Sequence, residues 1–194
     1  MLRAVIATAC LAVAIPANAQ TQSPVANAFI DLCVDGRGAV GHVTDRATSQ
    51  GWRKLPDGLI PNLGLPFTSK QAWVNSSAAN PVTVIAGVFD MPANNAAIHM
   101  TTCVVVSQPA ISASPISPDP HVAFSEWLEM APDPRFTNSE QTAFGFTTEG
   151  QERRSLQGLS DLAVTQAVAN GRVTVITLMG RGTDRIMIYV APSL

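Results

Sequence analysis

The sequence predicts an α+β fold, in which an antiparallel sheet of about five to six strands has helices packed on a face. Three observations predict it. Capped helix starts open each half of the chain, runs rich in β-branched residues follow them, and Gly, Pro and Asn turn signals separate those runs.

The first half is expected to begin with two short helices. Ser23-Pro24 combines a hydroxyl cap with proline at the first helical position, and apolar residues then recur at helical spacing. A second helix is expected in residues 39–49, with Gly51 at its C-terminal end. Repeated prolines in residues 53–70 exclude a long helix and predict an ordered, extended loop.

The second half repeats this order of helices and strands. Asp119-Pro120 starts a third helix, and Ser160-Asp161 favours a fourth over residues 160–169, although Asn170-Gly171 is also a hairpin turn signal. The expected strands are residues 71–75, 82–89, 97–107, 141–148, 172–179 and 185–190, with 151–156 as a candidate to pair back on 141–148.

Domain boundaries follow from the same pattern. Residues 1–19 are predicted to be a signal peptide, 20–107 an N-terminal α+β half and 121–194 a C-terminal α+β half. The Pro- and Ser-rich residues 108–120 are either a linker or a crossover loop, so the halves form two small domains or a single one.

The N-terminus has the three parts of a cleavable secretory leader. A basic start ending at Arg3 precedes an apolar run, and Ala17-Asn18-Ala19 supplies small residues for a signal peptidase. The run is shorter than the roughly 17–25 residues of a membrane span. Lipidation of Cys10 is disfavoured, because the apolar run continues beyond it. The protein is therefore predicted to be exported, to the periplasm or outside the cell.

Composition limits the partners. Charged residues make up 13% of the chain, against roughly 25% in ordinary proteins. Because Arg3 is the only charged residue of the leader, its removal takes the formal net charge from −2 to −3. Such a chain does not attract polyanions, so nucleic acid is not expected as a partner. No apolar run beyond the leader approaches membrane length, so no transmembrane segment is expected in the mature chain.

Two cysteines, Cys33 and Cys103, remain once the leader is removed. An even pair in an oxidising compartment predicts a disulfide, although two buried free thiols are the alternative. The bond would close a loop of about 71 residues and stabilise the fold by roughly 4 kcal/mol in the chain-entropy model.

Three histidines are the candidate bases and metal ligands. On a helix, His42 and Asp45 would be neighbours that could orient a general base, but a surface ion pair is the more ordinary outcome. His99 falls in an apolar strand close to Cys103, and His121 lies in another element. No HxH or HxxxH pair occurs, so neither a metal nor a cofactor is expected.

The remaining charged clusters have ordinary explanations too. Residues 31–36 resemble the start of a calcium-binding loop only in part. Counted from Asp31, the third position is Cys33 and the twelfth is His42, and neither supplies the oxygen ligand that calcium needs. Glu126 and Glu129 are expected to face water rather than flank a cleft. Positive charge gathers in the C-terminal part, where an anion site is conceivable but acidic neighbours offset it; the residues are Arg153, Arg154, Arg172, Arg181 and Arg185.

No catalytic motif stands out: the nucleophile elbow, S-x-x-K, H-E-x-x-H, Walker A and C-x-x-C patterns are all missing from the sequence. The sequence therefore favours a non-enzymatic exported module, one that binds an unknown protein or small ligand or is associated with the cell envelope. The alternative is a small exported hydrolase with scattered catalytic residues and His42 or His99 as base. The catalytic residues of such an enzyme are unknown.

The leader gives the first testable prediction: the mature protein starts at Gln20. Intact-mass analysis of the exported protein should show the loss of residues 1–19, because Ala17-Asn18-Ala19 provides the cleavage site. Retention of Met1 to Ala19 in the exported protein would contradict it.

Overall fold

The computed structural model describes residues 23–76, 81–93, 96–107, 116–149, 152–181 and 184–193. The predicted leader, residues 1–19, lies outside these ranges, as do residues 108–115 of the predicted linker or crossover loop.

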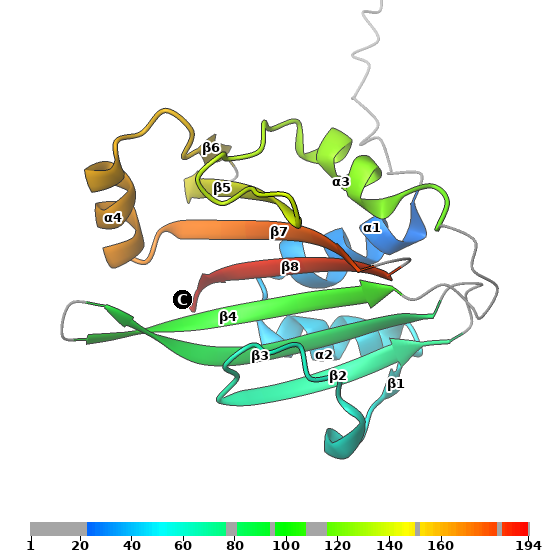
Figure 1. Ribbon diagram of the computed structural model, residues 1–194. Helices are drawn as coiled ribbons and strands as arrows, with labels where there is room; N and C mark the ends of the chain where they lie inside the picture. Colours follow the sequence, from blue (N-terminus) through cyan, green and yellow to red (C-terminus); the bar gives the residue numbers. More distant parts are fainter. Residues whose placement is uncertain are drawn as a thin grey trace, which may run out of the picture.

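One antiparallel sheet of eight strands forms the centre of the molecule (Figure 1). The strand order is β1-β2-β3-β4-β8-β7-β5-β6, so the pairing of β4 with β8 joins the two halves of the chain in one continuous sheet. The strands are β1 (Arg53–Lys54), β2 (Ser69–Asn75), β3 (Val82–Ala93), β4 (Ala96–Ser107), β5 (Gln141–Glu149), β6 (Glu152–Ser155), β7 (Val173–Arg181) and β8 (Asp184–Pro192).

The α+β class and the antiparallel sheet are confirmed, but the expected number of five to six strands is wrong. The two edge strands account for the difference: β1 is not predicted, whereas the candidate pairing of residues 151–156 with 141–148 is confirmed by β6 and β5. β1 has two residues, both exposed, inside the proline-rich loop, and β6 is the charged sequence Glu-Arg-Arg-Ser. Neither carries the apolar alternation that marks a strand in sequence; each forms because a longer neighbour offers its backbone hydrogen bonds.

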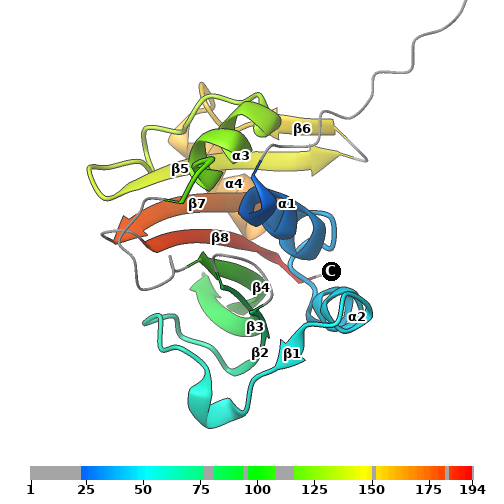
Figure 2. The ribbon, with the colours of Figure 1, turned by 90° about the vertical axis from the view of Figure 1, so that its right-hand side faces the viewer.

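Helices α1, α2 and α3 cover one face of the sheet, and Figure 2 shows α1 and α2 along it. The Ser160–Ala169 segment forms a helix, as favoured, with the Ser160 hydroxyl accepting a hydrogen bond from the Ala163 amide (3.3 Å). The helices are α1 (Pro24–Phe29), the π-helical turn η1 (Ile30–Val34), α2 (Val40–Ser49), the 3₁₀ turn η2 (Asp57–Leu59), α3 (Pro120–Leu128) and α4 (Asp161–Ala169). Among the described residues, no helix has the length and hydrophobicity to cross a bilayer.

The main core lies between the helices and the sheet. Phe29 of α1 packs edge-on against Phe124 of α3 at 5.2 Å between ring centroids, and Phe124 meets Phe144 of β5 at 6.3 Å. Two smaller clusters cover the opposite face. The expected extended loop packs Leu55, Leu63, Leu65 and Phe67 there, and α4 closes over Leu156 and Val173.

A disulfide joins the helical layer to the sheet. Cys33 of η1 and Cys103 of β4 are fully buried, and their Cα atoms lie 5.3 Å apart. The predicted pairing is therefore confirmed at disulfide distance. It is consistent with an oxidising compartment.

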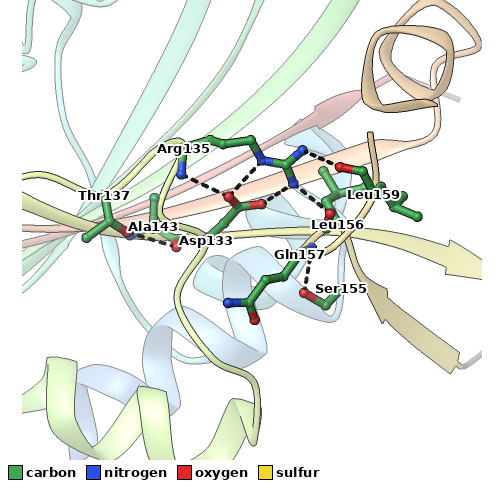
Figure 3. Close-up of polar contacts among 8 residues, drawn as sticks. All are labelled: Asp133, Arg135, Thr137, Ala143, Ser155, Leu156, Gln157 and Leu159. Atoms are coloured by element: carbon green, nitrogen blue, oxygen red, sulfur yellow. Dashed lines mark hydrogen bonds and ion pairs between the residues drawn. The ribbon is translucent and has the colours of Figure 1, made fainter. Parts of the chain in front are cut away.

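An ion pair with one buried partner, Asp133, fixes the connection between α3 and β5 (Figure 3). Asp133 is 1% exposed, and its carboxylate accepts hydrogen bonds from the Arg135 side chain at 2.6 and 2.9 Å. The Arg135 guanidinium also donates to the carbonyl oxygen of Leu156 (2.6 Å), beyond the end of β6. One side chain thus ties the α3–β5 connection to the β6–α4 connection.

Replacing Asp133 should destabilise the fold. Asp133→Asn removes the buried carboxylate that accepts from Arg135, so we expect a loss of about 2 kcal/mol in the free energy of unfolding by urea denaturation at pH 7. The hydrogen bond from Arg135 lowers the pKa of Asp133. This contribution is therefore complete above roughly pH 5 and is lost as the pH falls toward the lowered folded-state pKa.

The variant should consequently lose less stability than the wild type between about pH 5 and pH 2. Asp45→Asn, at an exposed position on α2 far from this pair in the chain, is the matched control. Equal stability of Asp133→Asn and wild type at pH 7 would contradict the role assigned to this pair.

Candidate functional site

A tight turn, residues 35–38, follows η1 and lies over the centre of the sheet. Arg37 adopts a left-handed conformation (φ 51°) that costs energy for a side chain other than glycine, and Gly38 follows it at φ 72°. The Gly38 amide donates to the carbonyl of Cys33 (2.8 Å), and the Thr101 hydroxyl of β4 donates to the carbonyl of Arg37 (3.2 Å). The turn is thus held from both the helix and the sheet.

Two glycines of this turn allow close approaches that a side chain would block. A Cβ on Gly38 would lie 3.0 Å from the ring of Tyr189 on β8. A Cβ on Gly36 would collide with the ring of His42, which packs under the turn. The His42 Nε2–H donates to the carbonyl of Asp31 (2.9 Å), so this imidazole supports the turn.

Two adjoining cavities lie beside the turn, with volumes of about 160 and 320 Å³. They share Arg37, Thr148 and Tyr189 and form one depression, which we call the arginine groove. The smaller cavity adds Asp35 and Arg153, and the larger adds Arg172. Together they fall within the size range of small-ligand pockets, roughly 300–1,000 Å³.

Arg153 of β6 has an unusual environment for a cation. It is half-buried, and its guanidinium stacks over the ring of Trp127 on α3, 4.6 Å from the ring centroid. Burial lowers the pKa of Arg153. Within the described part of the chain, the guanidinium makes no hydrogen bond or ion pair. Arg153 is therefore a half-buried charge whose N–H donors have no protein acceptor among the described residues and remain open to a ligand.

Asp35 lies in the same small cavity but does not pair with Arg153. Burial, followed by the neighbouring charge of Asp31, raises the pKa of Asp35, and Arg153 opposes the rise. No described residue donates a hydrogen bond to the Asp35 carboxylate. Asp35 and Arg153 thus border the small cavity as an anion and a cation. They interact electrostatically but form no direct ion pair.

Tyr189 forms the floor of the groove. It is the only tyrosine in the sequence and is 4% exposed. Burial raises the pKa of Tyr189, and a hydrogen bond with Thr174 works against the rise. Three arginines face one aspartate among the described residues lining the groove, so it favours anions.

A second pocket, of about 640 Å³, lies at the start of α3 and contains Asp119, His121 and Arg185. Arg185 donates to Asp119 (3.1 and 3.2 Å), and the Asp119 carboxylate caps α3 through the His121 amide (2.9 Å). Burial lowers the pKa of His121, so its ring is neutral at pH 7. The buried Nε2 of that ring has no partner within the described structure.

The other predicted candidates lie apart from both pockets. His99 pairs with Asp90 (2.5 Å) across the β3–β4 hairpin, where the histidine side chain is 75% exposed. Asp45 is exposed on α2 and forms no ion pair with His42 among the residues described. Glu126 and Glu129 are exposed on and after α3, as expected. No three His, Cys, Asp or Glu side chains gather into a metal site in the described ranges.

The predicted arginine cluster separates in the structure. Arg153 and Arg172 come together at the groove, whereas Arg154 turns to Glu152 (3.3 Å) and Arg185 to Asp119. The side chain of Arg181 lies outside the described residues. Calcium is also disfavoured at residues 31–36, because the Asp31 carboxylate accepts hydrogen bonds from Arg46 and Gln50 instead.

Sequence reasoning missed Arg37, Trp127 and Tyr189. Local signals could have found two of them, Arg37 and Tyr189. Arg37 stands between two glycines directly after the cysteine-bearing helix, a position where a turn needs a left-handed residue. Tyr189 is the sole tyrosine, on a strand with strict alternation. The stacking of Trp127 on Arg153 depends on long-range packing and leaves no local signal.

Comparison of the chain with known protein families, with curated proteins and with solved structures finds no match. Its function therefore has to be inferred from the chemistry of these two pockets.

Proposed function

We propose that the chain is a non-enzymatic exported binding module that takes a small anionic ligand in the arginine groove. One observation carries the proposal: the half-buried Arg153, stacked on Trp127, has no acceptor for its N–H donors in the described protein. A ligand carboxylate or phosphate would accept two of these donors at once. Because the guanidinium is already fixed by stacking, binding would cost little side-chain entropy.

Export is supported by the predicted leader and by the disulfide, which suits an oxidising compartment. A binding role is supported by the composition of the groove. The residues that line it include arginines, threonines, whose side chains carry hydroxyl groups, and a tyrosine whose pKa is raised. No histidine or cysteine thiol lines it among the described residues.

Arg153→Gln should weaken anion binding at least about tenfold, because it removes a charge-assisted, bidentate interaction. The measurement is a titration of the mature protein with sodium phosphate and with sodium glutarate at constant ionic strength. The indole N–H signal of Trp127, assigned with a Trp127→Phe variant, should shift and saturate with at least one of the two anions.

Arg154→Gln is the matched control, because it removes the same charge one residue away, from a side chain that turns to Glu152. It should leave the titration unchanged. Equal losses in the two variants, or the absence of a saturable shift with phosphate, glutarate and glutamate alike, would rule out the proposed function.

A hydrolase remains the second candidate, and the pocket at the start of α3 is the observation that favours it. It places the neutral imidazole of His121 near Asp119, with Ser139 and Glu140 also lining the cavity. However, the Asp119 carboxylate is engaged by Arg185 and by a backbone amide, so it does not orient the imidazole. His42 and His99 are no better placed, because one supports the turn and the other is exposed at the hairpin.

His121→Ala distinguishes the two functions. Under the binding proposal, this variant keeps the phosphate and glutarate titrations of the wild type. Hydrolysis of ester or amide test substrates by the wild-type protein, abolished in His121→Ala with folding intact, would favour the hydrolase instead.

A further inference from the structure

The small cavity of the arginine groove is bipolar, and this property narrows the chemistry of the ligand. Asp35 and Arg153 both line it and influence each other's pKa. Neither side chain makes a hydrogen bond or ion pair with the described residues. The cavity therefore presents an unused acceptor and an unused donor group, which a ligand of a single charge cannot satisfy together.

A purely anionic group would meet a penalty here. Bound to Arg153, it would lie close to the carboxylate of Asp35, which is exposed at the mouth of the small cavity, and the like charges would repel each other. A ligand with a positive group beside its negative group avoids this cost. An α-amino acid has this arrangement, since its carboxylate and ammonium are attached to the same carbon.

The larger cavity indicates what the rest of the ligand carries. It adjoins the small cavity through Arg37, Thr148 and Tyr189, and Arg172 lines it. A second acidic group on the ligand would therefore find a cation in the second cavity. Across the two cavities, three arginines and one aspartate match two carboxylates and one ammonium in sign, with a net attraction for an anion.

Building on the proposed function, we infer that the arginine groove binds a free acidic α-amino acid. Its α-carboxylate is bound by Arg153, its α-ammonium by Asp35, and its side-chain carboxylate lies on the Arg172 side of Tyr189. The chemistry selects against peptides, whose internal residues lack both the free ammonium and the free carboxylate. It also selects against simple dicarboxylates, which leave Asp35 without a partner.

The test uses three ligands that differ by one group. Glutamate carries both carboxylates and the ammonium, glutarate lacks the ammonium, and 4-aminobutyrate lacks the α-carboxylate. In isothermal titration calorimetry with the mature, disulfide-bonded protein, glutamate should bind at least tenfold more tightly than either analogue. Asp35→Asn should reverse the order of glutamate and glutarate, because it removes the ammonium's partner and the repulsion against the second anion.

Arg154→Gln should keep the wild-type order, since its side chain turns away to Glu152. Equal or tighter binding of glutarate to the wild type would overturn the amino-acid inference while leaving anion binding intact. If glutamate, glutarate and phosphate all fail to bind, both the inference and the proposed function fail. A preference for glutamate that persists in a folded Asp35→Asn variant would overturn the assignment of Asp35.

Discussion

The bond between Cys33 and Cys103 holds η1 against the middle of the sheet, where Cys103 is the register partner of Tyr189. The turn that carries Asp35 and Arg37 begins directly after η1, so the disulfide fixes it over the tyrosine ring. A left-handed arginine beside a buried ring is a costly arrangement, and it persists because the surrounding contacts leave the turn no other position. The arginine groove therefore depends on this covalent link between helix and sheet.

The opposite side of the groove comes from the other half of the chain. Trp127 is placed by α3, which packs through Phe124 against α1, and it holds the guanidinium of Arg153 from the edge strand β6. The Asp133–Arg135 pair links the α3–β5 connection to the β6–α4 connection, through the hydrogen bond from Arg135 to Leu156. Both sides of the groove are thus set by tertiary contacts of the fold, which suits a preorganised binding site.

Much of the fold could be predicted from local signals, because those signals act over a few residues. Ser23-Pro24 and Ser160 mark helix starts through backbone caps, and two remaining cysteines leave a single pairing. The edge strand β1 could not be predicted, since a two-residue strand has no periodicity and exists only through its neighbour. The arginine groove could not be predicted from the sequence either. Arg37, Arg153 and Tyr189 meet only because β8 lies between β4 and β7, an order that no local pattern contains.

The dependence of the groove on the disulfide can be measured directly. The quantity is the dissociation constant of glutamate for the wild type and for Cys33→Ala/Cys103→Ala, at a temperature where NMR amide spectra show the sheet of the variant intact. If the disulfide fixes the turn over Tyr189, the folded variant binds at least tenfold more weakly, because the turn must be ordered when the ligand binds. Equal dissociation constants in two folded proteins would contradict the account.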